Sequence, residues 1–398
     1  MVWAAQLVLL IVRRILLMHK IQEIFHLSYN EYCNHYNPSD VQHKAAFSIM
    51  NCKSGKLGCN FSVCKDCGHL EVHNNSCRNR NCPCCQGLLK ELWIDARKAE
   101  VIDSPYFHVV FTLPAELNPL IFGNQALLYS LMHKCASETL LELSADKKYL
   151  GATPGIIQVL HTWGQELNFH PHIHCIITGA GLTKTKQLLK SRRKFFIPVK
   201  VLGKMFRGKF LDQLQLLYEK HKFHFSNSCL KLKNSYEWKE LKNSLHCKSW
   251  IPYIKETFNG FGNAIDYLGR YTHRIAISNS RIKSVTNTHM TFSAKDYKTG
   301  EQKLVTLSHV EFLRRFLMHV LPSGFQKIRY YGFLNNRSKK INLKLIEKLT
   351  GKALFQSKFI SMSHDELIQS LWNINVHLCT NCGCSSMRHI GKTYSCRK

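Results

Sequence analysis

Apolar residues recur every three to four positions in several parts of the chain, which is the spacing of an amphipathic helix. Helices are predicted over residues 19–50, 88–102, 125–143 and 310–322, and Pro322 stops the last one. Shorter runs of β-branched and aromatic residues predict strands instead. These strands are "YFHVVFTLP" (106–114), "GIIQVLHTWG" (155–164) and "HPHIHCIITGAG" (170–181). A helix followed by a strand is predicted over 260–282, and a hairpin over 297–308.

The order of these elements indicates an α+β fold. A strand, a helix and two further strands form the opening of a split βαβ, ferredoxin-like layer, in which an antiparallel sheet carries its helices on one face. Residues 183–250 are basic and mixed, and few periodic signals occur there. We interpret this segment as an insertion into the layer.

The strand over 170–181 carries a candidate metal site. Side chains alternate between the two faces of a strand, so His172 and His174 share one face while Ile173 points into the core. Two imidazoles about 7 Å apart along a strand face can bind the same metal ion. The alternative is a pair of strand histidines that is satisfied by hydrogen bonds.

The charge of the chain predicts a polyanionic partner. The 55 Lys and Arg against 26 Asp and Glu give a net charge of +29, and the basic residues are spread along the whole chain. Nucleic acid is the first candidate, because basic membrane-binding proteins usually concentrate their charge on one amphipathic segment. No membrane partner is therefore expected.

The first seventeen residues, "MVWAAQLVLLIVRRILL", form an apolar leader that Arg13 and Arg14 interrupt. No small-residue cleavage site follows, so a non-native upstream start or a minor N-terminal helix is favoured over an export signal. The segment is too short and too charged to span a bilayer.

The 17 cysteines cluster in CxxC spacings, which favours metal binding in a reducing compartment over disulfides. Two CxxC pairs separated by fourteen residues predict a zinc ribbon with Cys64, Cys67, Cys82 and Cys85 as ligands. Four neighbouring residues are the alternative ligands: Cys77, Cys84, His69 and His73. At the C-terminus, a second zinc and free thiols are equally open for Cys379, Cys382, Cys384 and Cys396.

Tyr267 and Tyr271, in "AIDYLGRYTHRIAISN", are four residues apart and would stack on one face of a helix. Without other evidence, the two tyrosines would be interpreted as part of the buried apolar face of this helix. Together with a metal-binding strand it suggests chemistry, because a tyrosine hydroxyl can attack a phosphodiester when a divalent ion polarises the phosphate. Two tyrosines on one face would allow two successive strand transfers.

The chain resembles the two-tyrosine HUH transposases of IS91-type bacterial insertion sequences over nearly its whole length after Met18. Five motifs carry the resemblance, in the order of the family: "NSCRNRNCPCCQ", "FHVVFTLP", "NFHPHIHCIITGAGL", "YLGRYTHRIAISNSRI" and "FLRRFLMHVLPSGFQKIRYYGFL". The chain departs from the family's pattern in the extra thiol of Cys84 and in the apolar leader.

The resemblance implies a metal-dependent single-strand DNA endonuclease and strand transferase, which nicks and rejoins insertion-sequence ends through a 5′-phosphotyrosine in rolling-circle transposition. Tyr267 and Tyr271 would be the nucleophiles, and His172 and His174 the ligands of a catalytic Mg²⁺ or Mn²⁺. Gln165 is the first candidate for the third ligand, because an amide oxygen suits these ions. His170 and His108 are the alternatives.

Several arginines beside these motifs are predicted to bind DNA: Arg78, Arg80, Arg270, Arg274, Arg281, Arg314 and Arg315. Some of Arg270, Arg274 and Arg281 are expected to hold the phosphate near the tyrosines. For Arg78, Arg80, Arg314 and Arg315, solvated surface arginines are the alternative. The expected domains are the leader (1–17), an N-terminal helix with the zinc-binding domain (18–98), the HUH catalytic domain (99–290, with the insertion at about 183–250) and a basic C-terminal α+β region (291–398). Structural Zn²⁺ is expected in the second of these.

The expected partners are single-stranded DNA at the element's termini and target DNA, with room for a homo-oligomer. The expected location is the bacterial cytoplasm, at the nucleoid when DNA is bound. Two other functions stay open from the sequence. One is a rolling-circle replication initiator of a plasmid or phage, and the other is a zinc-ribbon DNA-binding protein without catalysis.

Overall fold

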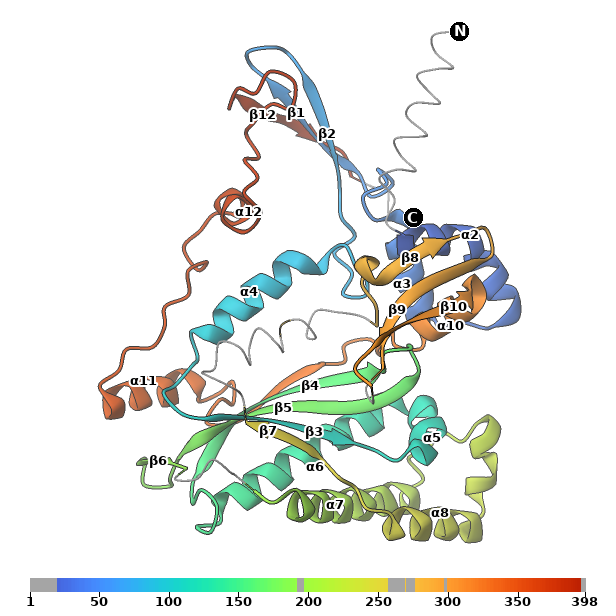
Figure 1. Cartoon of the computed structure of the whole chain (residues 1–398), viewed down its shortest axis with the longest axis vertical. Helices are drawn as coiled ribbons and strands as arrows, with labels where there is room; N and C mark the ends of the chain where they lie inside the picture. The colour runs from blue at the N-terminus through green and yellow to red at the C-terminus, as the bar shows by residue number, and fades with distance from the viewer. Residues whose placement is uncertain (1–19, 192–196, 257–268, 270–275, 297–298, 395–398) are drawn as a thin grey trace.

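The computed structural model describes residues 20–191, 197–256, 269, 276–296 and 299–394 (Figure 1). The apolar leader lies outside these residues. Within the described part of the chain, no helix combines the length and the apolar character that crossing a membrane requires.

A six-stranded sheet forms the centre of the molecule, and the strands follow the order β11-β4-β5-β3-β7, with β6 paired to β5. All of these pairs are antiparallel. The strands are β3 (Tyr106–Thr112), β4 (Thr153–Trp163), β5 (Phe169–Leu182), β6 (Leu188–Lys190), β7 (Tyr253–Glu256) and β11 (Ile328–Gly332). Because β5 lies between β3 and β4, the strand–helix–strand–strand order makes a split βαβ layer, and the predicted α+β class is confirmed.

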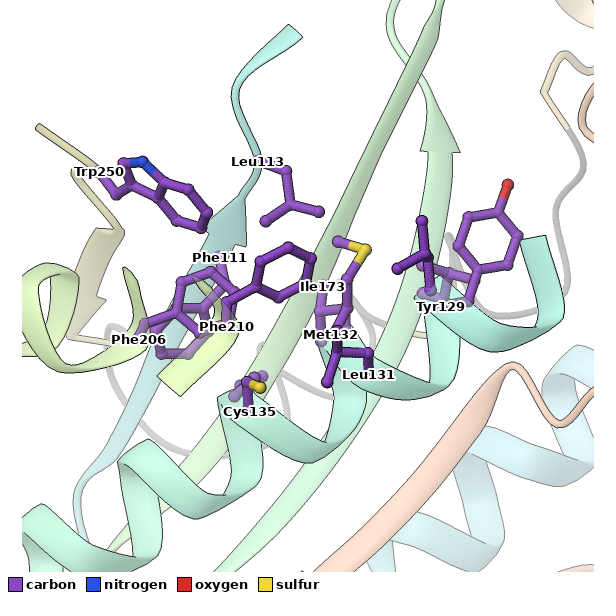
Figure 2. Packing of buried hydrophobic residues seen from close by; sticks show 14 of the residues in the cluster. Phe111, Leu113, Tyr129, Leu131, Met132, Cys135, Ile173, Phe206, Phe210 and Trp250 are labelled. Atoms are coloured by element: carbon purple, nitrogen blue, oxygen red, sulfur yellow. The ribbon is translucent and has the colours of Figure 1, made fainter. Parts of the chain in front are cut away.

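One face of this sheet packs on helices that bury the largest apolar core. The helices are α5 (Asn118–Gly123), α6 (Gln125–Ala145), α7 (Val199–Glu219) and α8 (Ser235–Cys247). Phe111 of β3 meets Phe206 of α7 with ring centroids 4.6 Å apart, and Figure 2 shows both beside Phe210 and Trp250. The segment interpreted as an insertion therefore supplies a helix layer to the core rather than a peripheral loop.

The opposite face of the sheet is covered by α4 (Gln86–Lys98) and α11 (Lys339–Thr350). Ile94 of α4 packs in one cluster with Val159 of β4 and Ile176 of β5. Since Val159 and Ile176 each lie two positions from a histidine, α4 covers the same face that those histidines occupy.

A second apolar core joins the N-terminal helices to a distant part of the chain. The helices α2 (Lys20–His35) and α3 (Asp40–Asn51) pack on α10 (His309–Leu317) and on the sheet β10-β9-β8. The rings of Phe25 and Phe316 meet edge to face at 5.5 Å. The strands of this sheet are β8 (Ile282–Val285), β9 (His289–Lys295) and β10 (Gln302–Ser308). The predicted domain boundary at residue 290 thus falls inside β9.

A small three-stranded sheet projects from the rest of the molecule and combines two early strands with the last strand of the described chain. The order is β12-β1-β2, with β1 (Cys59–Cys64), β2 (Leu70–Asn74) and β12 (Met387–Lys392). Figure 1 shows the chain leaving α11, passing α12 (His364–Trp372) and returning to lie along β1. Three short 3₁₀ turns complete the described elements: η1 (Ala115–Leu117), η2 (Asn227–Lys233) and η3 (Asn279–Arg281).

Candidate metal centres

Three histidines converge on the sheet face that α4 covers. His161 of β4 pairs across the ladder with His172 of β5, and His174 follows two residues later on the same face. One nitrogen from each ring lies within 4.8 Å of the others. His161 and His174 are buried, and Ile173 between the β5 histidines enters the core on the other face, as predicted. This spacing of nitrogen atoms suits one shared cation.

Neighbouring groups hold two of these rings in place. Nδ1 of His172 lies 2.7 Å from the carbonyl oxygen of His170. A carbonyl only accepts hydrogen bonds, so Nδ1 donates its proton and Nε2 presents its lone pair. Nε2 of His108 on β3 lies 2.8 Å from Nδ1 of His174. Such outer contacts fix the tautomer and orientation of metal-binding histidines.

Burial keeps these imidazoles neutral, which is the form that binds a metal. Burial lowers the pKa of His172 to about 4, despite the opposing hydrogen bond to the carbonyl of His170. It lowers the pKa of His108 to about 4 as well, and that of His174 well below its usual value. At neutral pH no proton therefore competes with a cation for the rings of His172 and His174.

Lys327, just before β11, lies near the histidines. Its ammonium lies 4.8 Å from the centre of the Trp163 ring, and Trp163 stacks on His161 at 5.0 Å. Burial, and secondarily the charge of Arg80, lower the pKa of Lys327 to about 7. The site thus combines a candidate metal-binding cluster with a lysine amine that is only partly protonated at neutral pH.

The structure places Gln165 in the turn between β4 and β5. Its Oε1 accepts a hydrogen bond from the backbone N–H of Lys295 at 3.5 Å, and its carbonyl accepts one from Nη2 of Arg281 at 2.5 Å. His161 instead supplies the third nitrogen beside His172 and His174. The sequence shows a short connection between the strands 155–164 and 170–181, but the pairing of His161 with His172 also depends on the register of the two strands.

Tyr267 and Tyr271, together with Arg270 and Arg274, lie outside the described residues. Gly269, between the two tyrosines, is described and buried. A Cβ atom built on it would lie 2.3 Å from Cγ1 of Ile94, so the backbone of Gly269 is in close contact with α4.

Most of the other predicted DNA-binding arginines contact protein groups. Arg80 donates from Nη1 to the carbonyl of Phe325 (2.7 Å) and from Nη2 to that of Pro322 (2.9 Å). Arg281 donates from Nε to the carbonyl of Ser293 at 2.8 Å. Arg78 is exposed, with a positive φ of 53°.

The arginines of α10 share one carboxylate. Arg314 and Arg315 donate to Glu311 from their Nε atoms at 2.6 and 2.7 Å. Arg315 also donates from Nη1 to the carbonyl of Glu166 at 3.0 Å. These contacts attach α10 to the turn between β4 and β5.

The structure corrects the predicted zinc ligands, because it separates the two CxxC pairs. One group contains Cys52, Cys77, Cys82 and Cys85, and we call it the inner cluster. The other contains Cys64, Cys67, Cys379 and Cys382, and we call it the outer cluster. In the inner cluster the sulfur of Cys85 lies 3.4 Å from that of Cys52 and 3.6 Å from that of Cys77. Sulfurs that share one zinc ion are about 3.8 Å apart, so this geometry fits tetrahedral Zn²⁺.

Cys84, the extra thiol of the second knuckle, is not a member of either cluster, whereas the alternative ligand Cys77 is. Cys52 was not among the predicted ligands. It lies at the end of α3, and its contact with Cys82 in the second core depends on how the helices fold back on the knuckle. Sequence spacing carries no information about such a contact.

Comparison with known proteins agrees with these features. Residues 24–113 match the family model described as a transposase zinc-binding domain, and residues 155–341 match one described as a putative transposase. The chain is 40% identical over 322 residues to the putative transposase y4qJ of Sinorhizobium fredii, covering 80% of this chain and 81% of that protein. No solved structure matches.

A second relative is the transposase for insertion sequence element IS801 of Pseudomonas savastanoi pv. phaseolicola. It is 30% identical over 311 residues, which cover 75% of this chain and 71% of the relative. Both relatives align over most of their own length, and the zinc-binding model covers all six cysteines that the N-terminal half contributes to the two clusters. The chain therefore belongs to the IS91 family of transposases.

Proposed function

We propose that this transposase nicks and rejoins single-stranded DNA at the ends of its element through a covalent 5′-phosphotyrosine, in rolling-circle transposition. The observation that carries the proposal is the convergence of His161, His172 and His174 on one sheet face, with ring nitrogens within 4.8 Å of one another. The net charge of +29 supports a DNA substrate, because it favours binding to a phosphate backbone.

These three histidines would hold the catalytic divalent cation. A bound cation would polarise the scissile phosphate and offset the negative charge that develops on it. Because Mg²⁺ prefers oxygen ligands, a cluster of nitrogen ligands favours Mn²⁺. His108 would orient His174 through their 2.8 Å contact, and the carbonyl of His170 would orient His172.

Tyr267 and Tyr271 are the proposed nucleophiles. The phenolic oxygen would form a bond to phosphorus while the bond from phosphorus to the 3′ oxygen breaks. The phenol proton passes to water and the leaving 3′ oxygen takes a proton from water, so the products are a 5′-phosphotyrosine and a free 3′ hydroxyl. Support comes from Gly269, which lies between the tyrosines and packs on Ile94, within the cluster that covers the histidine face.

A denaturing gel tests the proposal directly. Labelled single-stranded DNA from the terminus of the element is incubated with the protein and Mn²⁺ or Mg²⁺. We expect a covalent protein–DNA adduct from the wild type and none from the Tyr267→Phe, Tyr271→Phe double variant. The single variants show which tyrosine acts first. Folded wild-type protein that forms no adduct with any terminal sequence, yet binds the DNA, would instead support a DNA-binding protein without catalysis.

A further inference from the structure

The outer cluster joins cysteines from opposite ends of the chain. Cys64 ends β1 and Cys67 follows it, whereas Cys379 and Cys382 precede β12, more than 300 positions later. The sulfur of Cys64 lies 3.6 Å from that of Cys382, and the sulfur of Cys67 lies 3.6 Å from that of Cys379. Both distances fit sulfurs that share one tetrahedral Zn²⁺, for which about 3.8 Å is expected.

The two CxxC pairs are built in the same way. In the first turn, the N–H of Gly68 donates to the carbonyl of Cys64, and in the second that of Gly383 donates to the carbonyl of Cys379, each at 3.0 Å. Both glycines have positive φ angles, 69° and 74°. A Cβ on either would meet no atom within 4 Å, so backbone conformation rather than space accounts for glycine here. Two matching turns that face each other are the usual frame of a four-cysteine zinc ribbon.

Contacts around the sulfurs fix the two turns relative to each other. Oε1 of Glu71 accepts hydrogen bonds from the backbone N–H and the hydroxyl of Thr380, at 3.0 and 2.7 Å. The backbone N–H of Lys65 donates to the carbonyl of Ser386 at 3.2 Å. Behind the turns, β1 and β12 pair in antiparallel register, with Cys64 opposite Met387.

Apolar burial is too small to hold this sheet together. Leu70, Val72 and Ile390 on its strands are exposed by 52%, 50% and 55%. A three-stranded sheet without a hydrophobic face on a core is unstable on its own, and small units of this kind depend on a metal. The residues that are buried here include Cys64 and Cys379, each exposed by 1%.

We propose that Cys64, Cys67, Cys379 and Cys382 bind a second structural Zn²⁺, distinct from the zinc of the inner cluster. The zinc-binding unit of this transposase is then completed by its C-terminal tail. This ion fixes β12 against β1 and closes a loop that contains the whole catalytic domain. The proposal does not depend on the tyrosine chemistry, because it concerns only how the two ends of the chain are joined.

Zinc content per chain tests this directly, in the full-length protein. We expect the Cys379→Ser, Cys382→Ser pair to lose one zinc relative to the wild type, and the Cys64→Ser, Cys67→Ser pair also to lose one. The variant with all four changes should again lose only one, because both pairs serve the same ion. Cys384→Ser and Cys247→Ser, at exposed thiols outside both clusters, are the matched controls and should retain the wild-type content.

Two results would overturn the proposal. One is an unchanged zinc content in the Cys379→Ser, Cys382→Ser variant, and the other is a loss of two ions in the fourfold variant. In case the serine variants misfold, Cys382→His gives a second test, because histidine also binds zinc. This variant should retain the full metal content, and after Co²⁺ substitution its absorption bands should move from those of a four-sulfur site. Bands identical to the wild type would show that position 382 is not a ligand.

Discussion

His161 faces His172 across the β4–β5 ladder, and it thereby brings a ring nitrogen from one strand close to two from the neighbouring strand. A strand in the middle of a sheet has little freedom to move, so the three nitrogens are held in place before any cation binds. Preorganisation of this kind reduces the free-energy cost of metal binding. His108, from a third strand, extends the same arrangement by its contact with His174.

Substitution of His161 tests whether it is the third ligand of the proposed metal site. We expect His161→Ala to weaken Mn²⁺ binding by at least about tenfold and to abolish the DNA adduct, because only two of the three imidazoles would remain to hold the ion. Gln165→Ala should leave Mn²⁺ affinity within about twofold, since the side chain of Gln165 contacts the backbone of Lys295. Mn²⁺ titration followed by electron paramagnetic resonance measures both. If Gln165→Ala weakened Mn²⁺ binding more than His161→Ala, the result would support Gln165 as the third ligand.

The residues of the histidine site could be predicted only in part. The period of two along a strand assigns His172 and His174 to one face without any knowledge of neighbours. His161 requires the register of two strands, which depends on the bulge before Trp163 and on the turn that follows. Cys52 and Cys379 could not be assigned, because contacts between distant segments leave no local pattern.

At the scale of elements, α4 connects the zinc-binding region with the candidate site. The helix begins directly after Cys85 of the inner cluster, and Ile94 on it contacts both the histidine face of the sheet and Gly269. A zinc-bound Cys85 would therefore fix the start of the helix against which Gly269 packs.

Gly269→Ala tests this packing. The added methyl group would lie 2.3 Å from Cγ1 of Ile94, so one of the two segments must move. We expect adduct formation to fall by at least about tenfold, since small displacements of a nucleophile cost that much. The double variant Gly269→Ala, Ile94→Ala should recover much of the activity. Gly208→Ala on α7, where a Cβ meets no atom, is the control; failure of the double variant to recover would argue against the contact.

Glu311 makes the stability of α10 dependent on pH. Hydrogen bonds from Arg314, and then from Arg315, lower its pKa to about 2, despite the opposing effect of burial. A depressed folded-state pKa means that the stabilisation is complete above the unfolded value of about 4.3 and is lost as the pH falls toward 2. Because the Glu311 side chain is partly exposed, solvent weakens this ion pair. We therefore expect Glu311→Gln to lower the free energy of unfolding by about 1 to 2 kcal/mol at pH 7.

Urea unfolding of both proteins between pH 7 and pH 3 measures this difference. The two curves should converge as the pH falls below about 4, because the protonated carboxyl resembles the amide. The control is Glu138→Gln on α6, whose ion pair with Lys134 is exposed and 4.0 Å long. It should change stability by less than about 0.5 kcal/mol at every pH. A difference at Glu311 that persisted unchanged to pH 3 would contradict the ion-pair explanation.

Elements with clear periodicity were predicted closely, including α6 and β3, while α7 was not. The apolar residues of α7 point into the main core, but basic residues between them obscure the pattern in the sequence. Phe206 and Phe210 contact Trp250 with ring centroids 5.7 Å apart, and Phe206 also contacts Phe111 of β3, so α7, β3 and the segment of Trp250 combine to bury these rings. Such a layer becomes evident only when its partners are known.

At the scale of the whole molecule, the two cysteine clusters occupy different surroundings. Cys52 and Cys82 are buried in the core that α2, α3 and α10 share with the small sheet β10-β9-β8. The outer cluster lies in the projecting sheet, with Cys67 and Cys382 exposed. Loss of metal from the inner cluster should therefore affect a large apolar core, whereas loss from the outer cluster should release only the C-terminal tail.

Calorimetry can separate these two roles. We expect Cys82→Ser to lower the free energy of unfolding by about 3 kcal/mol or more, because it removes a buried ligand and leaves a hydroxyl among apolar groups. Cys382→Ser should shift the main transition by less than about 1 kcal/mol, yet expose the segment between α12 and β12 to protease, since nearly all of residues 373–386 are exposed. Cys384→Ser, an exposed thiol beside the outer cluster, controls for the serine itself. Equal destabilisation by Cys82→Ser and Cys382→Ser would mean that the tail supports the second core directly. In that case the projecting sheet and the helical core would have to unfold as one cooperative unit.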